Sequence, residues 1–313
     1  MPLHRIFEEA FPPYLRAAVE GVNVAMLAFG TTGSGKTFAV EGEGSTQGLI
    51  GHFAHSLFQM LEDKKFRLNA GRAPTMSSQG YTYSVKMRYV EIVDEEINDL
   101  LVHASSTAQG GLNIIYDEWE GPSISNTTWM PCSSAGHLLD MFSMAKRART
   151  DAATEFGPLS DRATSLTTIE LLQVASNVTQ NDSSVLASRV YFIDLPGAEK
   201  LQEDAESLRI KEGNTLNKTI LSLANLLNNL SQNQVDYVNY DEGMLTSLLK
   251  DILGGNCLTT ALFTLQNGDP VGTSLVLNYM RLFKNIFNFP VVNDNRMLGL
   301  LRKFRVEISQ LLN

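Results

Sequence analysis

The stretch Phe29–Phe38 reads FGTTGSGKTF and contains the pattern G-x-x-x-x-G-K followed by Thr. Because glycines have no Cβ atom, they let the backbone N–H groups of such a run turn inward and bind the oxygens of a phosphate. The lysine of this pattern reaches terminal phosphates, and the hydroxyl after it holds Mg²⁺. The sequence therefore predicts a nucleotide phosphate loop formed by Gly30, Thr31, Thr32, Gly33, Ser34, Gly35, Lys36, Thr37 and Phe38.

The residues on either side of this loop fit the same interpretation. Residues 22–29 (VNVAMLAF) form an apolar run that is typical of a buried strand. A helix that begins at Lys36 would add its dipole to the anion site. The alternative is a flexible Gly/Ser loop that matches the pattern by chance, and the strand before the loop argues against it.

Further along the chain, strand-like and helix-like segments alternate, which favours an α/β fold. The chain shows no internal repeat and no low-complexity linker, so a single domain is the simpler interpretation. Residues 175–184 read as a polar loop between two strands. Periodicity predicts helices over 12–20, 49–64, 95–101, 135–149, 216–230, 244–253 and 280–286, and strands over 22–29, 81–93, 167–174, 188–195 and 259–265.

A second nucleotide motif follows the strand over 188–195. The run Asp194-Leu195-Pro196-Gly197 has the form Asp-x-x-Gly, in which the Asp orients Mg²⁺ and the Gly N–H senses the γ-phosphate. Asp-Leu-Pro-Gly also occurs in large GTPases, which need an Asn/Thr-Lys-x-Asp run to pair with guanine. The nearest run is Asn217-Lys218-Thr219-Ile220, which lacks that Asp, so the GTPase alternative loses support.

Composition excludes several other classes of protein. The net charge of −9 over 313 residues argues against nucleic acid as a partner, because such binding draws on clustered Lys and Arg. The sequence contains no apolar run of 18 residues, which is the length that would predict a membrane span. The two cysteines, Cys132 and Cys257, are too few for a disulfide framework, which is typical of a reducing cytoplasmic setting. The five histidines show no metal-ligand spacing.

Taken in order, these motifs resemble the kinesin motor domain over nearly the whole chain. Residues 89–101 (YVEIVDEEINDLL) resemble the family's YxEIYNExIxDLL signature, and residues 149–154 (RTDAAT) its RxxAxT run. Residues 194–199 (DLPGAE) are similar to the second switch, DLAGSE, and residues 253–256 match LGGN. The helix after the second switch is matched at Leu216-Asn217-Lys218-Thr219.

The resemblance implies an α/β phosphate-loop NTPase domain with a central mixed β-sheet and helices on both faces. It implies ATP or ADP with Mg²⁺ as cofactors, and tubulin in microtubules as partner. Thr37, Thr164 and Asp194 would organise Mg²⁺, Gly197 would sense the γ-phosphate, and Asn217 would help to hold the water network. The resemblance also implies that the protein lies in the cytoplasm on the cytoskeleton. Because divergent kinesins occur in cilia and centrioles, these are the narrower expectation.

The first switch departs from the family pattern NxxSSRSH, which residues 160–167 (SDRATSLT) match. The family's Arg closes the site by a salt bridge to the Glu of the second switch, here Glu199, but Ser165 stands in its place. Ala163 replaces the first Ser, and Thr164 keeps the hydroxyl on the Mg²⁺ side. Phosphoryl transfer depends on positioned groups, so we predict nucleotide binding with weak or lost hydrolysis. Arg162 is the candidate for compensation.

Two further departures concern movement along a track. The family begins with a strand carrying RxRP, preceded by a cover strand, and this sequence starts after that point, which puts neck-linker docking in doubt. Between residues 200 and 251, eight acidic residues outnumber five basic ones. Where the family reads VPYRDSKLTRLL, residues 238–249 have lost three basic side chains, at Asp241, Met244 and Ser247. Such losses weaken steering toward an acidic surface.

The tail has a different pattern from the domain. Residues 290–294 (PVVND) resemble the neck linker of kinesins with an N-terminal motor. Beyond them, apolar residues follow a 4-3-4-3 spacing at Met297, Leu301, Phe304, Ile308 and Leu311. This spacing predicts either the seam of a dimeric coiled coil or a helix packed on its own domain. The sequence thus predicts a kinesin-like domain over 1–288 and a neck over 289–313, with homo- or heterodimers through the neck helix. Impaired motor activity is the first hypothesis; an active ATP-driven motor and a nucleotide-free scaffold are the alternatives.

Overall fold

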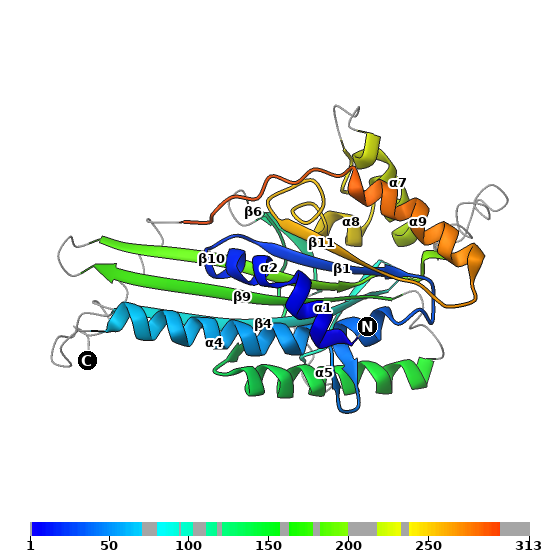
Figure 1. Cartoon of the computed structure of the whole chain (residues 1–313). Helices are drawn as coiled ribbons and strands as arrows, with labels where there is room; N and C mark the ends of the chain where they lie inside the picture. The colour runs from blue at the N-terminus through cyan, green and yellow to red at the C-terminus, as the bar shows by residue number, and fades with distance from the viewer. Residues whose placement is uncertain are drawn as a thin grey trace.

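The computed structural model describes residues 2–70, 80–93, 95–102, 111–117, 121–156, 163–177, 182–199, 218–232 and 238–294. A twisted central sheet lies between two layers of helices, as Figure 1 shows. The phosphate loop leaves one end of this sheet. The fold class predicted from the sequence, α/β with a mixed sheet and helices on both faces, is confirmed.

The sheet has seven strands, and its hydrogen-bonded order is β11-β1-β10-β9-β4-β5 with β8 beside β4. The first three strands are parallel and the remaining pairs are antiparallel, which makes the sheet mixed. The strands are β11 (Leu258–Thr264), β1 (Val24–Gly30), β10 (Asp182–Asp194), β9 (Thr164–Asn177), β4 (Tyr81–Val93), β5 (Glu96–Asp99) and β8 (Met130–Cys132).

Each face of the sheet has its own apolar core. On one face pack α1 (Leu3–Ala10), α2 (Pro12–Val19), α4 (Leu49–Asn69) and α5 (Ala135–Phe156). The short helix α3 (Lys36–Glu41) contacts α4 and the strands β1 and β10. On the other face pack α7 (Lys218–Gln232), α8 (Met244–Leu248) and α9 (Pro270–Lys284). β1 is therefore buried along its whole length.

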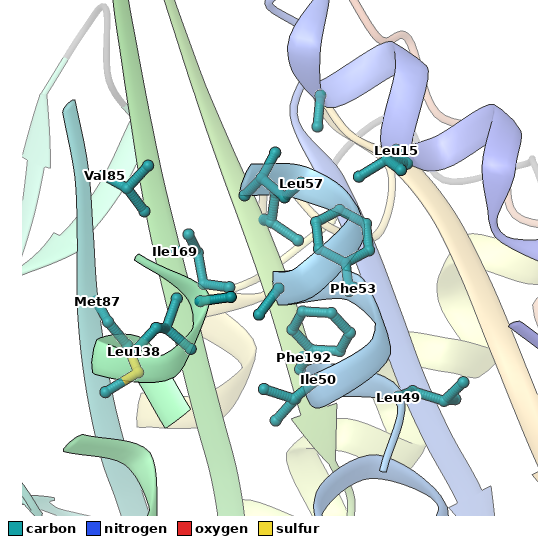
Figure 2. Close-up of a cluster of buried hydrophobic side chains, with 14 of the residues drawn as sticks. Leu15, Leu49, Ile50, Phe53, Leu57, Val85, Met87, Leu138, Ile169 and Phe192 are labelled. Atoms are coloured by element: carbon teal, nitrogen blue, oxygen red, sulfur yellow. The ribbon is translucent and has the colours of Figure 1, made fainter. Parts of the chain in front are cut away.

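Figure 2 shows the first of these cores, between α4 and the sheet. Phe53 of α4 meets Phe192 of β10 edge to face, with 5.4 Å between the ring centroids. Leu57, Ile169 and Met87 are fully buried around them. This packing fixes β10, whose last residue is Asp194, against the helix layer.

Two small hairpins complete the described part. One pairs β2 (Gly42–Glu43) with β3 (Thr46–Gln47) directly after α3. The other pairs β6 (Ile114–Asp117) with β7 (Gly121–Ile124) and contacts α8. Neither hairpin was predicted from the sequence, because both are too short for an alternating pattern.

Several predicted elements were wrong in kind or extent. Within the predicted helix 95–101, Glu96–Asp99 forms a strand, β5, because Val90–Val93 of β4 pairs with it and this pairing overrides helical spacing. The predicted loop 175–184 is mostly strand, since β9 and β10 extend past the body of the sheet as a long antiparallel ribbon. The predicted helix 244–253 ends at Leu248.

The last helix begins earlier than predicted. α9 starts at Pro270, and the Asp269 side chain accepts a hydrogen bond from the Gly272 N–H at 2.8 Å. Asp followed by Pro is a helix start signal, but inside the polar run Gln266–Pro270 it reads as a turn. The structure therefore adds residues 270–279, the first two thirds of this helix.

The segment after α9 lies against the domain. Asn288 Nδ2 donates to the carbonyl oxygens of Ile252 and Cys257, and the Asn293 N–H donates to Gly21 O at 2.8 Å. Val292 forms an isolated β-bridge with Val22, just before the start of β1. The sequence left the docking of this segment in doubt, and the described residues show it docked. The predicted seam residues Met297 to Leu311 lie outside the described residues.

Candidate functional site

The phosphate loop connects the buried strand β1 to α3, as predicted. Gly33 and Gly35 have φ angles of +78° and +96°, which side chains with a Cβ rarely adopt. A Cβ on Gly30 would lie 2.5 Å from Thr264 O, so only glycine lets the loop pass this close to β11. The loop therefore needs its glycines for backbone shape, as the motif requires.

Lys36 lies buried under the loop, with 8% of its surface exposed. Its Nζ donates to Thr31 O at 2.9 Å, which holds the ammonium group inside the curve of the loop. The Ser34 hydroxyl donates to the same carbonyl at 2.7 Å and lies 2.6 Å from Thr264 Oγ1. These bonds place a positive charge beneath the glycine-rich turn.

Thr37 and Asp194 meet although they are far apart in sequence. β1 and β10 are parallel neighbours with Ala28 beside Asp194, so both strands end at the same edge of the sheet. The Thr37 hydroxyl donates a short hydrogen bond to Asp194 Oδ2. The second carboxylate oxygen, Asp194 Oδ1, is buried and has no hydrogen-bond partner in the described part of the chain.

Burial raises the pKa of Asp194 above its ordinary value of 3.8, and the bond from Thr37 and the charge of Lys36 only partly oppose this. In the folded state this carboxyl therefore keeps its proton to a higher pH than in the unfolded chain. Stability consequently falls as pH rises above about 4, and the cost of the buried charge persists at neutral pH.

We expect Asp194→Asn to melt at a higher temperature than the wild type at neutral pH without nucleotide, because it removes this charge. The difference should shrink as the pH falls toward the range where Asp194 is protonated. Thermal melts across a pH series, with Asp63→Asn on the exposed side of α4 as control, measure both effects. A lower melting temperature of Asp194→Asn at neutral pH would contradict the assignment.

Gly197 and Glu199 close the site from the opposite side. The Thr32 N–H lies 3.0 Å and 3.2 Å from the two carboxylate oxygens of Glu199. A Cβ on Gly197 would come within 2.4 Å of both Glu199 Oε1 and Thr32 Oγ1. Burial alone would raise the pKa of Glu199, but the bonds from Thr32 and the charge of Lys36 outweigh it and lower this pKa.

Between these groups lies a cavity of about 220 Å³. Its described lining comprises Thr32, Gly33, Gly35, Lys36, Thr37, Phe38, Ala163, Asp194, Leu195, Pro196 and Gly197. Lys36 is the only cationic side chain in this described lining. The cavity thus combines a glycine cradle, a cation and a carboxylate.

The residues present fit Mg²⁺ bound together with a nucleotide. Mg²⁺ takes few protein ligands, usually one or two carboxylates beside hydroxyl, water and phosphate oxygens. Asp194 Oδ1 has no hydrogen-bond partner among the described residues, and Thr37 Oγ1 contacts Oδ2 of the same carboxylate. In the described part of the chain no three His, Cys, Asp or Glu side chains gather as they would for a metal bound by protein alone. When bound, Mg²⁺ would neutralise phosphate charge.

The predicted first-switch residues lie at the start of β9. Ser165 stands directly opposite Asp194 in the sheet, so these two share a face and Thr164 points to the other. The Thr164 hydroxyl is buried and has no hydrogen-bond partner among the residues that the structure describes, and its neighbour Ala163 lines the cavity instead. Phe38 is 41% exposed at the cavity rim. Asn217 and Arg162 lie outside the described residues.

A buried ionic network behind α3 was not predicted from the sequence. Glu41, the last residue of α3, accepts hydrogen bonds from Tyr89 Oη at 2.8 Å and Arg149 Nη1 at 3.1 Å. Arg149 also donates to Glu91 Oε1 at 2.7 Å, and Lys146 Nζ lies 3.3 Å from Glu41 Oε2. The network joins α3, β4 and α5 directly behind the phosphate loop.

Charges within this network perturb its side chains. Burial and the Glu41 carboxylate raise the pKa of Tyr89. Burial alone would lower the pKa of Arg149, but Tyr89, Glu41 and Glu91 outweigh it, so Arg149 stays charged. The only signal in the sequence was the RTDAAT run at 149–154, which marked Arg149 without showing its partners.

Comparison with known proteins gives one consistent family. The family model described as Kinesin motor domain matches residues 3–286. Among curated proteins, the kinesin-like protein KIF16B of Homo sapiens is 28% identical over 98% of this chain and 23% of its own length. The kinesin-like protein Klp98A of Drosophila melanogaster is 31% identical over 94% of this chain and 24% of its own length. This chain therefore spans about a quarter of the length of these relatives.

Two solved structures share the fold. The structure of a fast kinesin superposes with a TM-score of 0.76 at 23% identity, covering 95% of this chain and 80% of that one. A KIF14 dimer with AMP-PNP in complex with a microtubule superposes with a TM-score of 0.78 at 27% identity. The match covers 97% of this chain and 82% of the KIF14 chain. Among the described helices of this chain, none is long and apolar enough to cross a membrane.

Proposed function

Because this chain belongs to the kinesin motor domain family, we propose that it is a nucleotide-binding, microtubule-associated protein in which ATP hydrolysis is weak or lost. One observation carries the nucleotide half of this proposal. Lys36, Thr37 and Asp194 converge on a single cavity beneath a glycine cradle, although Asp194 lies more than 150 residues from the loop. We place ATP or ADP with Mg²⁺ in this cavity.

The roles of the residues follow from their positions. The N–H groups of Gly30–Thr37 and the Lys36 ammonium would bind the phosphates, with Thr31, Thr32 and Ser34 shaping the turn. Thr37 and Asp194 would hold Mg²⁺, joined by Thr164 after a local change at the start of β9. Gly197 would donate its N–H to the γ-phosphate, and Glu199 and Asn217 would hold the attacking water.

Hydrolysis is weakened because the group that closes the site is missing. With Ser165 in the place of the family's Arg, the Glu199 carboxylate instead accepts from the Thr32 N–H of the phosphate loop. The Ser165 hydroxyl instead lies 3.5 Å from Glu41 Oε1, in the ionic network behind α3. Glu199 would position the attacking water only after release from the Thr32 N–H, and loss of positioning lowers phosphoryl-transfer rates by orders of magnitude.

Tubulin is the proposed partner because a domain of the same fold is bound to a microtubule in a similar structure. The matching face here carries fewer basic side chains. Asp241 accepts a hydrogen bond from the Tyr116 hydroxyl at 2.6 Å, and Ser247 is buried, so neither presents a cation to a track. We therefore propose weakened binding to the acidic tubulin surface.

Restoring basic residues on this face should strengthen microtubule binding. We expect the double variant Asp241→Arg, Met244→Lys to gain affinity, with each added ion pair contributing up to about 1 kcal/mol. The gain should fade at high salt, because exposed pairs are screened. Co-sedimentation with microtubules measures it. The control is Glu43→Arg, Thr46→Lys on the exposed β2–β3 hairpin, which changes the net charge by the same amount. An equal gain from this control would refute a specific face.

We propose a boundary near residue 288, with the motor-like domain before it and a neck over 289–313. Asn288 and Asn293 would dock the neck linker, and the segment beyond would pair with another chain as a homo- or heterodimer. The cytoskeleton is the proposed location, with cilia and centrioles the narrower proposal.

Calorimetric titration of the intact chain with Mg-ATP and Mg-ADP tests the proposal, followed by steady-state ATP turnover with and without microtubules. Nucleotide binding with slow turnover that microtubules do not accelerate is the expected result. Strong acceleration by microtubules would instead support an active motor. No binding of either nucleotide would favour a scaffold that works without them.

A further inference from the structure

The Glu199 carboxylate lies among groups to which the proposed function assigns the terminal phosphate of a nucleotide. Its oxygens Oε1 and Oε2 are 3.2 Å and 3.0 Å from the backbone nitrogen of Thr32, whose N–H is one of the loop donors assigned to phosphate. A Cβ on Gly197 would clash with both Glu199 Oε1 and Thr32 Oγ1. The carboxylate therefore contacts both Gly197, whose N–H is assigned to the γ-phosphate, and the phosphate loop.

The charge at this position also resembles that of a bound phosphate. Burial opposes ionisation of Glu199, but the bonds from Thr32 and the charge of Lys36 outweigh it and lower the pKa, so the side chain is an anion at neutral pH. A carboxylate, like a phosphate, offers negatively charged oxygens to N–H donors. The chain thus places an anion of its own beside Lys36, the Thr32 N–H and Gly197.

We infer that Glu199 sets a preference of this site for a nucleoside diphosphate over a triphosphate, an inference that rests on the proposed nucleotide function. A diphosphate would leave the carboxylate bonded to the Thr32 N–H. A triphosphate would bring a further anion to the same donor groups, and two anions this close repel each other. Mg-ATP therefore binds only those molecules in which Glu199 has left the loop, and its affinity is reduced by that fraction.

The residues at the start of β9 explain why Glu199 stays at the loop. Among the described residues 163–165 of the first switch, none carries a charge that could draw the carboxylate away. The Ser165 hydroxyl lies 3.5 Å from Glu41 Oε1 and is directed to the network behind α3. In the described lining of the cavity, the one cation is Lys36, which itself belongs to the phosphate loop. Binding of a triphosphate is therefore coupled to movement of the second switch.

Glu199→Ala tests the inference through the ratio of two affinities. Calorimetric titrations of the intact chain with Mg-ADP and with Mg-AMP-PNP, a triphosphate analogue that resists hydrolysis, measure both affinities without turnover. The wild type should prefer Mg-ADP. Glu199→Ala should gain at least about tenfold in affinity for Mg-AMP-PNP relative to Mg-ADP, because the triphosphate no longer displaces a charged hydrogen-bond partner. Loss of a negative charge favours both nucleotides at long range, so the ratio isolates the contact with Thr32.

Two further variants separate the contact from general effects on charge and folding. Glu199→Gln keeps the size of the side chain and an oxygen for the Thr32 N–H but loses the charge, so it should shift the ratio in the same direction by less than Glu199→Ala. Glu9→Ala removes an exposed carboxylate of α1 that is not part of the described cavity lining. This control changes the net charge equally and should leave the ratio as in the wild type.

The Thr32 amide gives a readout that needs no nucleotide. In the free chain its hydrogen should exchange with solvent at least about tenfold more slowly in the wild type than in Glu199→Ala, because the carboxylate protects it. Equal exchange rates, a wild type without preference for Mg-ADP, or a ratio that Glu199→Ala leaves unchanged would overturn the inference while nucleotide binding itself still stands. If neither the wild type nor Glu199→Ala binds either nucleotide, the proposed function fails and the inference fails with it.

Discussion

Lys36→Ala should lose at least about a hundredfold in affinity for Mg-ATP and Mg-ADP. Lys36 is the only cation in the described lining of the cavity, and its burial leaves little water to screen its charge. Among the described lining residues, a phosphate in the cradle without it would meet backbone N–H groups, the hydroxyls of Thr32 and Thr37, and the carboxylate of Asp194. Calorimetric titration with each nucleotide measures the loss.

Lys65→Ala is the matched control for this variant. Lys65 is an exposed lysine of α4, 46% accessible, and lies near the exposed Glu62. Its removal changes the net charge by the same amount and should leave nucleotide affinity unchanged. If Lys36→Ala bound as tightly as the wild type and Lys65→Ala, the nucleotide would bind elsewhere. A wild type without binding would show instead that the loop no longer works as a nucleotide site.

The second large effect concerns stability. Glu41→Ala should lower the free energy of unfolding by about 3 kcal/mol, because it leaves Arg149 and Tyr89 buried with fewer partners. The estimate takes the lower end of the range for broken buried pairs, since Arg149 retains Glu91. Glu41→Gln keeps hydrogen-bonding capacity and should lose less. Denaturant unfolding monitored by circular dichroism measures both variants.

The pair Arg5–Glu9 provides the comparison. It has a similar distance, 2.8 Å, but its side chains are 65% and 53% exposed. Water screens this pair, so Glu9→Ala should change stability by less than about 1 kcal/mol. Equal losses from Glu9→Ala and Glu41→Ala would mean that the network behind α3 contributes no more than a surface pair.

Glu41→Ala should also weaken nucleotide binding, because Glu41 anchors the end of the short helix that begins at Lys36. Loosening α3 would let the lysine and Thr37 leave the cavity. Thermal shift on addition of Mg-ADP separates this effect from stability, since it reports binding to whatever fraction remains folded.

Local signals in the sequence were enough for some elements. β4 was predicted with its observed bounds, because the run YTYSVKMRYVEIV is rich in aromatic and β-branched residues and alternates them with polar residues over much of its length. α9 was predicted only in its last third. Its start depends on Asp269, whose side chain caps the helix, and this bond cannot be recognised in a run that also fits a turn.

Other elements depended on partners remote in sequence. Residues 95–101 have helical spacing, but Glu96–Asp99 within them forms β5 because the end of β4 offers an edge at that point. The sequence indicated that Ser165 cannot pair with Glu199 as the family's Arg does, with Arg162 as the candidate replacement. The structure gives Glu199 the Thr32 N–H, a contact across 167 positions that no local pattern indicates.

The sequence by itself determined the phosphate loop and its lysine, because glycine conformation and the reach of Lys36 are properties of a few adjacent residues. It also determined the family, since many short motifs stand in one order. The tertiary structure alone decided what surrounds the loop: the carboxylate that Thr37 contacts and the network behind α3. These depend on strand order and packing, which join residues more than 100 positions apart.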